Sequence, residues 1–135
     1  MEKDKLGEHF VNSRALMIKV FSSSGYFPDG NELERQILGA YCFGVINGYA
    51  MENGLHPGEV HGIMLSLLLQ MFGYGTEAAA GFCEELVRST NRKYHPTMYA
   101  IIHRGLEGYF MLKKEDLAAF KKDVEEVMRI VKEAS

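Results

Sequence analysis

The chain has only two cysteines, no excess of basic residues and no long apolar run. Cys42 and Cys83 each lie in an apolar helical pattern and not in a CxxC pair, so we expect two buried free thiols in a reducing compartment. The net charge is −3 and no basic stripe is present, which argues against nucleic-acid binding. The uncharged run at residues 36–51 is shorter than a membrane span and contains two polar amides. No apolar signal core follows the first residues. These features predict a soluble, cytoplasmic protein.

What the composition does contain is typical of a globular protein, with 47% apolar and 24% charged residues in 135. A chain of this length can bury roughly 68% of its unfolded surface in one domain. Apolar residues recur at helical spacing, and we find no β-alternation, internal repeat or low-complexity tract. We therefore predict an all-α protein. Residues 1–135 should form a single compact domain of about six helices around a central apolar helix at residues 32–53.

The central helix is predicted from both its ends and its composition. Asn31 is a suitable N-cap and Gly54 a suitable C-terminal residue, while residues 36–51 carry no charge on any side. A helix that is apolar all round is covered by neighbours on several sides. Glycine costs about 1 kcal/mol relative to alanine inside a helix. We therefore expect Gly44 and Gly48 to be present because another helix crosses closely there.

Four of the other helices show apolar stripes that predict their inner faces. The helix at about residues 6–21 should turn inward Leu6, Phe10, Met17, Val20 and Phe21. The next, opened by Pro57, has the stripe Val60, Ile63, Met64, Leu67, Leu68 and Met71. The fourth, capped by Thr76, should bury Ala79, Phe82, Cys83, Leu86 and Val87. The last, at about residues 115–132, should bury Leu117, Phe120, Val124, Val127, Met128 and Val131. The extra apolar flank Leu65, Leu69 and Phe72 offers a homodimer contact as one alternative.

The helix opened by Pro96 has an apolar side and an unusual second side. Its apolar side consists of Met98, Ile101, Ile102, Gly105, Leu106 and Tyr109. On the adjoining side lie Tyr99, His103, Glu107 and Phe110, where a solvent-facing helix normally carries lysine and glutamate. This second side either meets a partner protein or completes a large core.

No catalytic or metal-binding motif is present in the sequence. There is no HExxH, and the glycines do not form a phosphate-binding loop. His103 and Glu107 are four residues apart, which suits an acid–base pair, a partner-recognition couple or a plain helix-surface pair, but no nucleophile is marked nearby. We predict neither an enzyme nor a bound cofactor. The alternative is a small ligand- or metal-binding module in which His61, His95 and His103 converge between helices.

Several short motifs across the middle two-thirds of the chain carry a family resemblance. They are LGAYCFG at residues 38–44, PGEVH at 57–61, FGY at 72–74 before the helix start at 76–82, and YHPT at 94–97 running into IIHRGLEG at 101–108. With these motifs the chain resembles immunity protein family 48 of bacterial polymorphic-toxin systems. The resemblance implies a small helical protein encoded beside a secreted toxin, often one delivered by a contact-dependent or type VI secretion apparatus. It implies tight, stoichiometric binding that occludes the toxin's active domain, and it carries over no catalytic residue.

An inhibitor of this kind needs a rigid surface with aromatic anchors and a few charges. The residues that offer this mixture around one helix are Tyr94, Tyr99, His103, Arg104, Glu107 and Phe110. We predict these six as the partner-binding site, with Tyr99, His103 and Glu107 at its centre. The expected partner is the cognate toxin, with no role for nucleic acid or membrane.

Overall fold

The computed structural model describes residues 2–135, with side chains from Lys5 onward, and these residues form six α-helices and no strand. The helices are α1 (Glu2–Ser24), α2 (Glu32–Asn53), α3 (Pro57–Gln70), α4 (Thr76–Arg88), α5 (Pro96–Lys113) and α6 (Leu117–Ala134). The all-α prediction is confirmed. Within the described residues, no helix combines the length and apolar character needed to cross a membrane.

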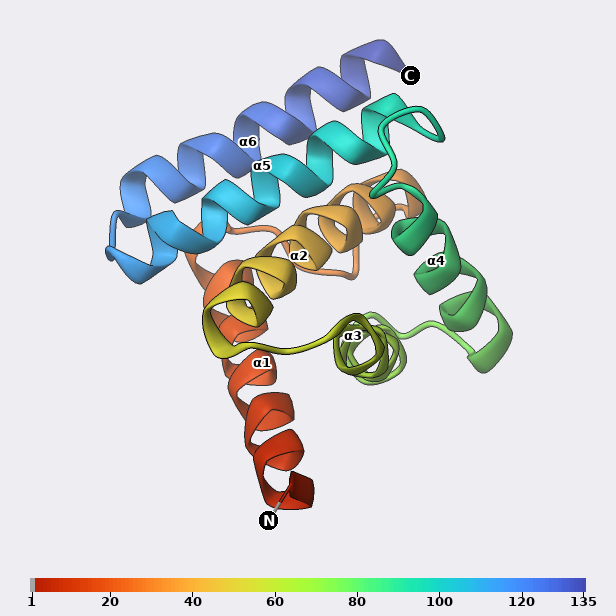
Figure 1. Ribbon diagram of the computed structural model, residues 1–135. Helices are drawn as coiled ribbons and strands as arrows, with labels where there is room; N and C mark the ends of the chain where they lie inside the picture. The colour runs from red at the N-terminus through yellow and green to blue at the C-terminus, as the bar shows by residue number, and fades with distance from the viewer. Residues whose placement is uncertain (1) are drawn as a thin grey trace.

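Helix α2 lies at the centre of the molecule, as its uncharged sequence predicts (Figure 1). The antiparallel pair α5 and α6 packs along one side of it, and α1 and α3 contact it from the other. Every residue from 37 to 50 is buried except Asn47. At its start the Asn31 side chain accepts a hydrogen bond from the Glu34 amide at 2.9 Å, and at its end Gly54 has φ 67°. Both predicted caps are confirmed.

Glycines let α2 and α5 cross with their backbones in contact. A Cβ placed on Gly44 would lie 1.9 Å from a backbone carbonyl oxygen of α5, and one on Gly105 would lie 2.0 Å from the Tyr41 carbonyl oxygen. One turn along, a Cβ placed on Gly48 would lie 2.8 Å from the ring of Tyr109. The predicted close crossing at Gly44 and Gly48 is confirmed. The contact fixes α5, and hence the outer side of α5, against the core.

A polar network joins α6 to this crossing. The Tyr41 hydroxyl donates to Asp123 at 2.8 Å, and the Arg104 guanidinium donates to both Asp123 and Glu126. Burial, together with the neighbouring Asp123 carboxylate, raises the pKa of Tyr41 well above its usual range. The Asp123 side chain is only 10% exposed, so it relies on these two donors for its hydrogen bonds. The network therefore positions three helices at once.

The inner faces predicted from sequence are largely confirmed, with five corrections. Thr76 does not cap α4: it is the first helical residue, and the extended Gly75 precedes it without any side-chain capping bond. Three residues expected inside are exposed, because they lie on helix ends or on a side that no neighbour covers: Leu6 (44%), Val87 (44%) and Leu117 (42%). Phe72 shows the opposite error. It is 1% exposed because its ring packs edge-on against Phe21, so it cannot form part of a dimer flank.

Candidate protein-binding surface

The outer side of α5 carries four of the six predicted binding residues. His103, Glu107 and Phe110 are exposed and Tyr99 is half-buried. At 100° per residue these four side chains span less than a quarter of the helix circumference, opposite the side on which Gly105 meets α2. They therefore do not complete the core. We call Tyr99, His103, Glu107 and Phe110 the α5 ridge.

Contacts within the helix fix the aromatic members of the ridge. The rings of Tyr99 and His103 stack with centroids 6.1 Å apart and an interplanar angle of 14°. The ring of Phe110 meets Tyr109 edge-on, with centroids 5.2 Å apart. His103 makes no ion pair or hydrogen bond with Glu107 in the described part of the chain, because its ring turns toward Tyr99 instead. The ridge is thus an aromatic pair beside a free carboxylate, and not the predicted His–Glu couple.

The other two predicted residues lie apart from the ridge. Tyr94 is in the loop before α5, is 45% exposed, and donates its hydroxyl to Glu85 on α4 at 2.7 Å. Arg104 is on the flank of α5 that faces α6, where Asp123 and Glu126 already occupy its guanidinium. Tyr94 remains available at the start of the helix, whereas the contacts of Arg104 are those of a residue that stabilises the fold.

The histidines proposed for a metal site do not converge. His61 is exposed on α3, and His103 stacks on Tyr99. His95 caps α5, with its Nδ1 accepting the Met98 amide at 3.1 Å. Among the described residues, no three or more histidine, cysteine or carboxylate side chains are grouped so that they could hold a metal ion. The geometry gives this alternative no support.

The cysteines offer no reactive group either. Both are buried and free, as predicted. Burial raises the pKa of Cys83 to about 11, and it raises the pKa of Cys42 further still. A thiol with such a pKa remains protonated near neutral pH and is a poor nucleophile. The two cysteines therefore behave as small core residues.

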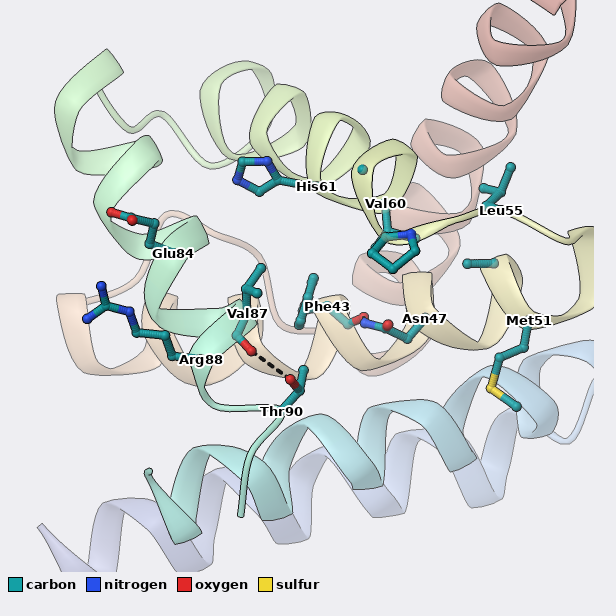
Figure 2. Close-up of a pocket in the computed structure, with 13 residues that line it drawn as sticks. Phe43, Asn47, Met51, Leu55, Val60, His61, Glu84, Val87, Arg88 and Thr90 are labelled. Carbon is teal, nitrogen blue, oxygen red and sulfur yellow. Dashed lines mark hydrogen bonds between the residues drawn. The ribbon is translucent and has the colours of Figure 1, made fainter. Parts of the chain in front are cut away.

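A groove that the sequence analysis missed opens between α2, α3 and α4, with a volume of about 680 Å³ (Figure 2). Its lining includes Asn47, Met51, Val60, His61, Val87 and Arg88. We call it the α2–α4 groove. Two features of the sequence belong to this groove: Val87, which was expected to face inward on α4, and Asn47, one of the two amides in the uncharged run.

The groove exists because α4 packs mainly on α3 and much less on α2. One contact of α4 with α2 is the Phe82 ring, which lies over Gly39 near the start of α2. Farther along α2 the side that carries Asn47 and Met51 stays open to solvent among the described residues: Asn47 is half-buried and Met51 is 69% exposed. In Figure 2 the lining side chains come from three helices: Asn47 and Met51 from α2, His61 from α3, and Val87 and Arg88 from α4. The groove is thus a concavity formed by the packing of these helices.

The family model described as Immunity protein 48 matches residues 10–132. The chain belongs to the immunity protein 48 family. The match runs from within α1 to near the end of α6, so both the α5 ridge and the α2–α4 groove are parts of the immunity-protein fold. Comparison with curated proteins and with solved structures gives no match.

Proposed function

We propose that this immunity protein binds and neutralises a cognate secreted bacterial toxin by occluding the toxin's active domain. The observation that carries the proposal is the family match, which covers residues 10–132 and hence nearly the whole fold. The partner we propose is a toxin encoded beside the chain and delivered by a contact-dependent or type VI secretion apparatus. The encounter would take place in the cytoplasm of the cell under attack.

The α5 ridge is the surface we propose for this contact. Its aromatic rings are already held by the Tyr99–His103 stack and by the contact of Phe110 with Tyr109, so little side-chain entropy is lost on binding. Aromatic side chains are enriched among the residues that dominate protein–protein affinity. Glu107 adds one charge that has no partner within the described chain and is available to the toxin.

The proposed mechanism needs no chemistry from the chain. Occlusion requires a surface that fits the toxin and stays bound, and a helical domain with a close α2–α5 crossing supplies such a rigid support. The cysteine thiols, which would be the strongest nucleophiles, are buried with raised pKa values. The proposal is therefore an interaction protein and not an enzyme.

Co-expression in sensitive bacteria tests this function. The toxin domain encoded by the neighbouring gene is induced with and without the chain, and growth is measured. The chain should restore growth, and Tyr99→Ala combined with His103→Ala should reduce that protection. Val11→Ala is a matched control, because Val11 is exposed on α1. Failure of the folded wild-type chain to protect the cells would contradict the proposed function.

A further inference from the structure

We infer that the centre of the toxin contact is the α2–α4 groove, and that the groove receives apolar side chains of the toxin that lie next to carboxylates. This inference rests on the proposed function and specifies the partner's chemistry. In this arrangement the α5 ridge lies at the rim of a larger toxin-binding surface.

The shape and lining of the groove suit an anchoring site. Phe43 and Val60 lie at its base with 3% and 6% of their surface exposed, while Met51 and Val87 stand at its edge with 69% and 44% exposed. A volume of about 680 Å³ is comparable to that of pockets that enclose drug-sized ligands, about 300–1,000 Å³. Residues that dominate affinity lie in concave sites that exclude water, whereas the outer side of a single helix cannot enclose a partner's side chain.

The groove adjoins the Tyr99 edge of the α5 ridge. On α5, Arg104 points to α6, so the opposite flank, which begins at Leu106 and Tyr99, faces away from α6. On α2, Tyr41 points to α6 through Asp123, so the flank with Asn47 and Met51 likewise faces away from α6. The two helices touch at their glycines, which places these two flanks side by side. One partner can therefore cover both.

The charges at one end of the groove define the partner further. From residue 86 to 94 the chain has three cations and no carboxylate, although the whole protein has a net charge of −3. None of the three forms an ion pair among the described residues. Arg88 lines the groove, and Arg92 and Lys93 are exposed in the loop that follows Thr90, another lining residue. The one acidic lining residue is Glu84.

This local excess of positive charge favours carboxylates on the toxin beside its apolar anchor. Complementary charge accelerates association and selects among partners more than it raises affinity. The two parts of the inference therefore have separate readouts. Apolar residues of the groove should control the dissociation constant, and the loop cations should control the association rate and its salt dependence.

The first test is calorimetric titration with the purified toxin domain of the neighbouring gene. Met51→Glu should weaken binding at least about thirty-fold, because a charge would be buried at the anchor. Val87→Glu should act likewise from the opposite wall. The matched control is Val11→Glu on α1, where Val11 is 62% exposed against 69% for Met51. The control should bind as the wild type does, and all three variants should keep the wild-type circular dichroism, since each site is exposed.

The second test is stopped-flow association with the same toxin domain. Reversing charge with Arg92→Glu and Lys93→Glu should slow association about tenfold at low salt and flatten its salt dependence. The control is a pair of consecutive exposed lysines on α6, changed by Lys121→Glu with Lys122→Glu. This control should change the association rate far less. Faster association of the loop variant would overturn the inference that the toxin places carboxylates beside this loop.

The outcomes separate the inference from the proposed function. If the groove variants bind normally while Tyr99→Ala with His103→Ala loses binding, the groove inference is wrong and the function stands. If the wild-type chain fails to bind the toxin, the proposed function fails, and the inference fails with it. Loss of binding in the groove variants with retention in Val11→Glu supports both.

Discussion

Replacing Gly44 by alanine should destabilise the protein, although alanine is the better helix former. The added Cβ would lie 1.9 Å from the Ile102 carbonyl oxygen and 2.7 Å from the Leu106 amide nitrogen, both backbone atoms of α5. Ordinary van der Waals contact begins near 3.4 Å, so the axes of α2 and α5 would have to separate by about 1.5 Å. A side chain could turn aside, but a helix backbone cannot. The strain therefore spreads over the whole α2–α5 contact.

Two opposing terms set the magnitude. Alanine gains about 1 kcal/mol over glycine in a helix interior. Overpacking a well-filled core costs about 1–3 kcal/mol, and a clash between two backbones belongs at or beyond the upper end. The net loss should be about 2 kcal/mol, which lowers the melting temperature of a domain of this size by roughly 6–10 °C. Thermal unfolding followed by far-ultraviolet circular dichroism measures it.

Gly81→Ala is the matched control, because Gly81 lies inside α4 and a Cβ there would meet nothing within 4 Å. The same substitution should here raise stability by about 0.5–1 kcal/mol. Opposite signs for the two variants would support the close crossing. A Gly44→Ala protein as stable as Gly81→Ala would refute it.

Three further predictions concern single contacts. Tyr41→Phe removes the hydrogen bond to buried Asp123 and should cost about 2 kcal/mol in urea unfolding; no loss would mean that Arg104 alone satisfies Asp123. The hydrogen bond from Lys113 lowers the pKa of Glu52 below 4.5, so this interaction stabilises the fold above that pH and is lost as the pH falls through the lowered value. Glu52→Gln should therefore flatten the acid limb of a melting-temperature profile, and an unchanged limb would contradict this. Glu115 has φ 59° at the turn before α6, so Glu115→Gly should raise the melting temperature by relieving about 1 kcal/mol of strain; a lower temperature would count against strain at this turn.

The sequence was sufficient for the fold because its strongest signals are local. Three kinds of local signal each favour one structure, and all three are confirmed: the uncharged run of α2, the prolines at the starts of α3 and α5, and the glycines at the crossing. The errors concern residues whose burial depends on which helix packs beside them. Val87 has the periodicity of a core residue, but α4 packs mainly on α3, so this residue faces a groove.

For the same reason, the sequence indicated only in part which of the six residues share one exposed surface. Periodicity placed Tyr99, His103 and Phe110 on one side of α5, and that side is indeed exposed. It could not reveal that Arg104 is held by α6, because its partners Asp123 and Glu126 are about twenty residues away along the chain. A groove formed by three helices is harder still to predict from the sequence, because each of these helices has the pattern of an ordinary amphipathic helix.

The most direct test of the central claim is titration of the toxin's own activity. The purified toxin domain of the neighbouring gene is assayed on its substrate while the purified chain is added in steps. If the chain occludes the toxin's active domain, activity should fall linearly and reach its end point at one chain per toxin. Met51→Glu should move this end point to a higher concentration, and Val11→Glu should not. Full toxin activity in the presence of a molar excess of the folded chain would contradict occlusion.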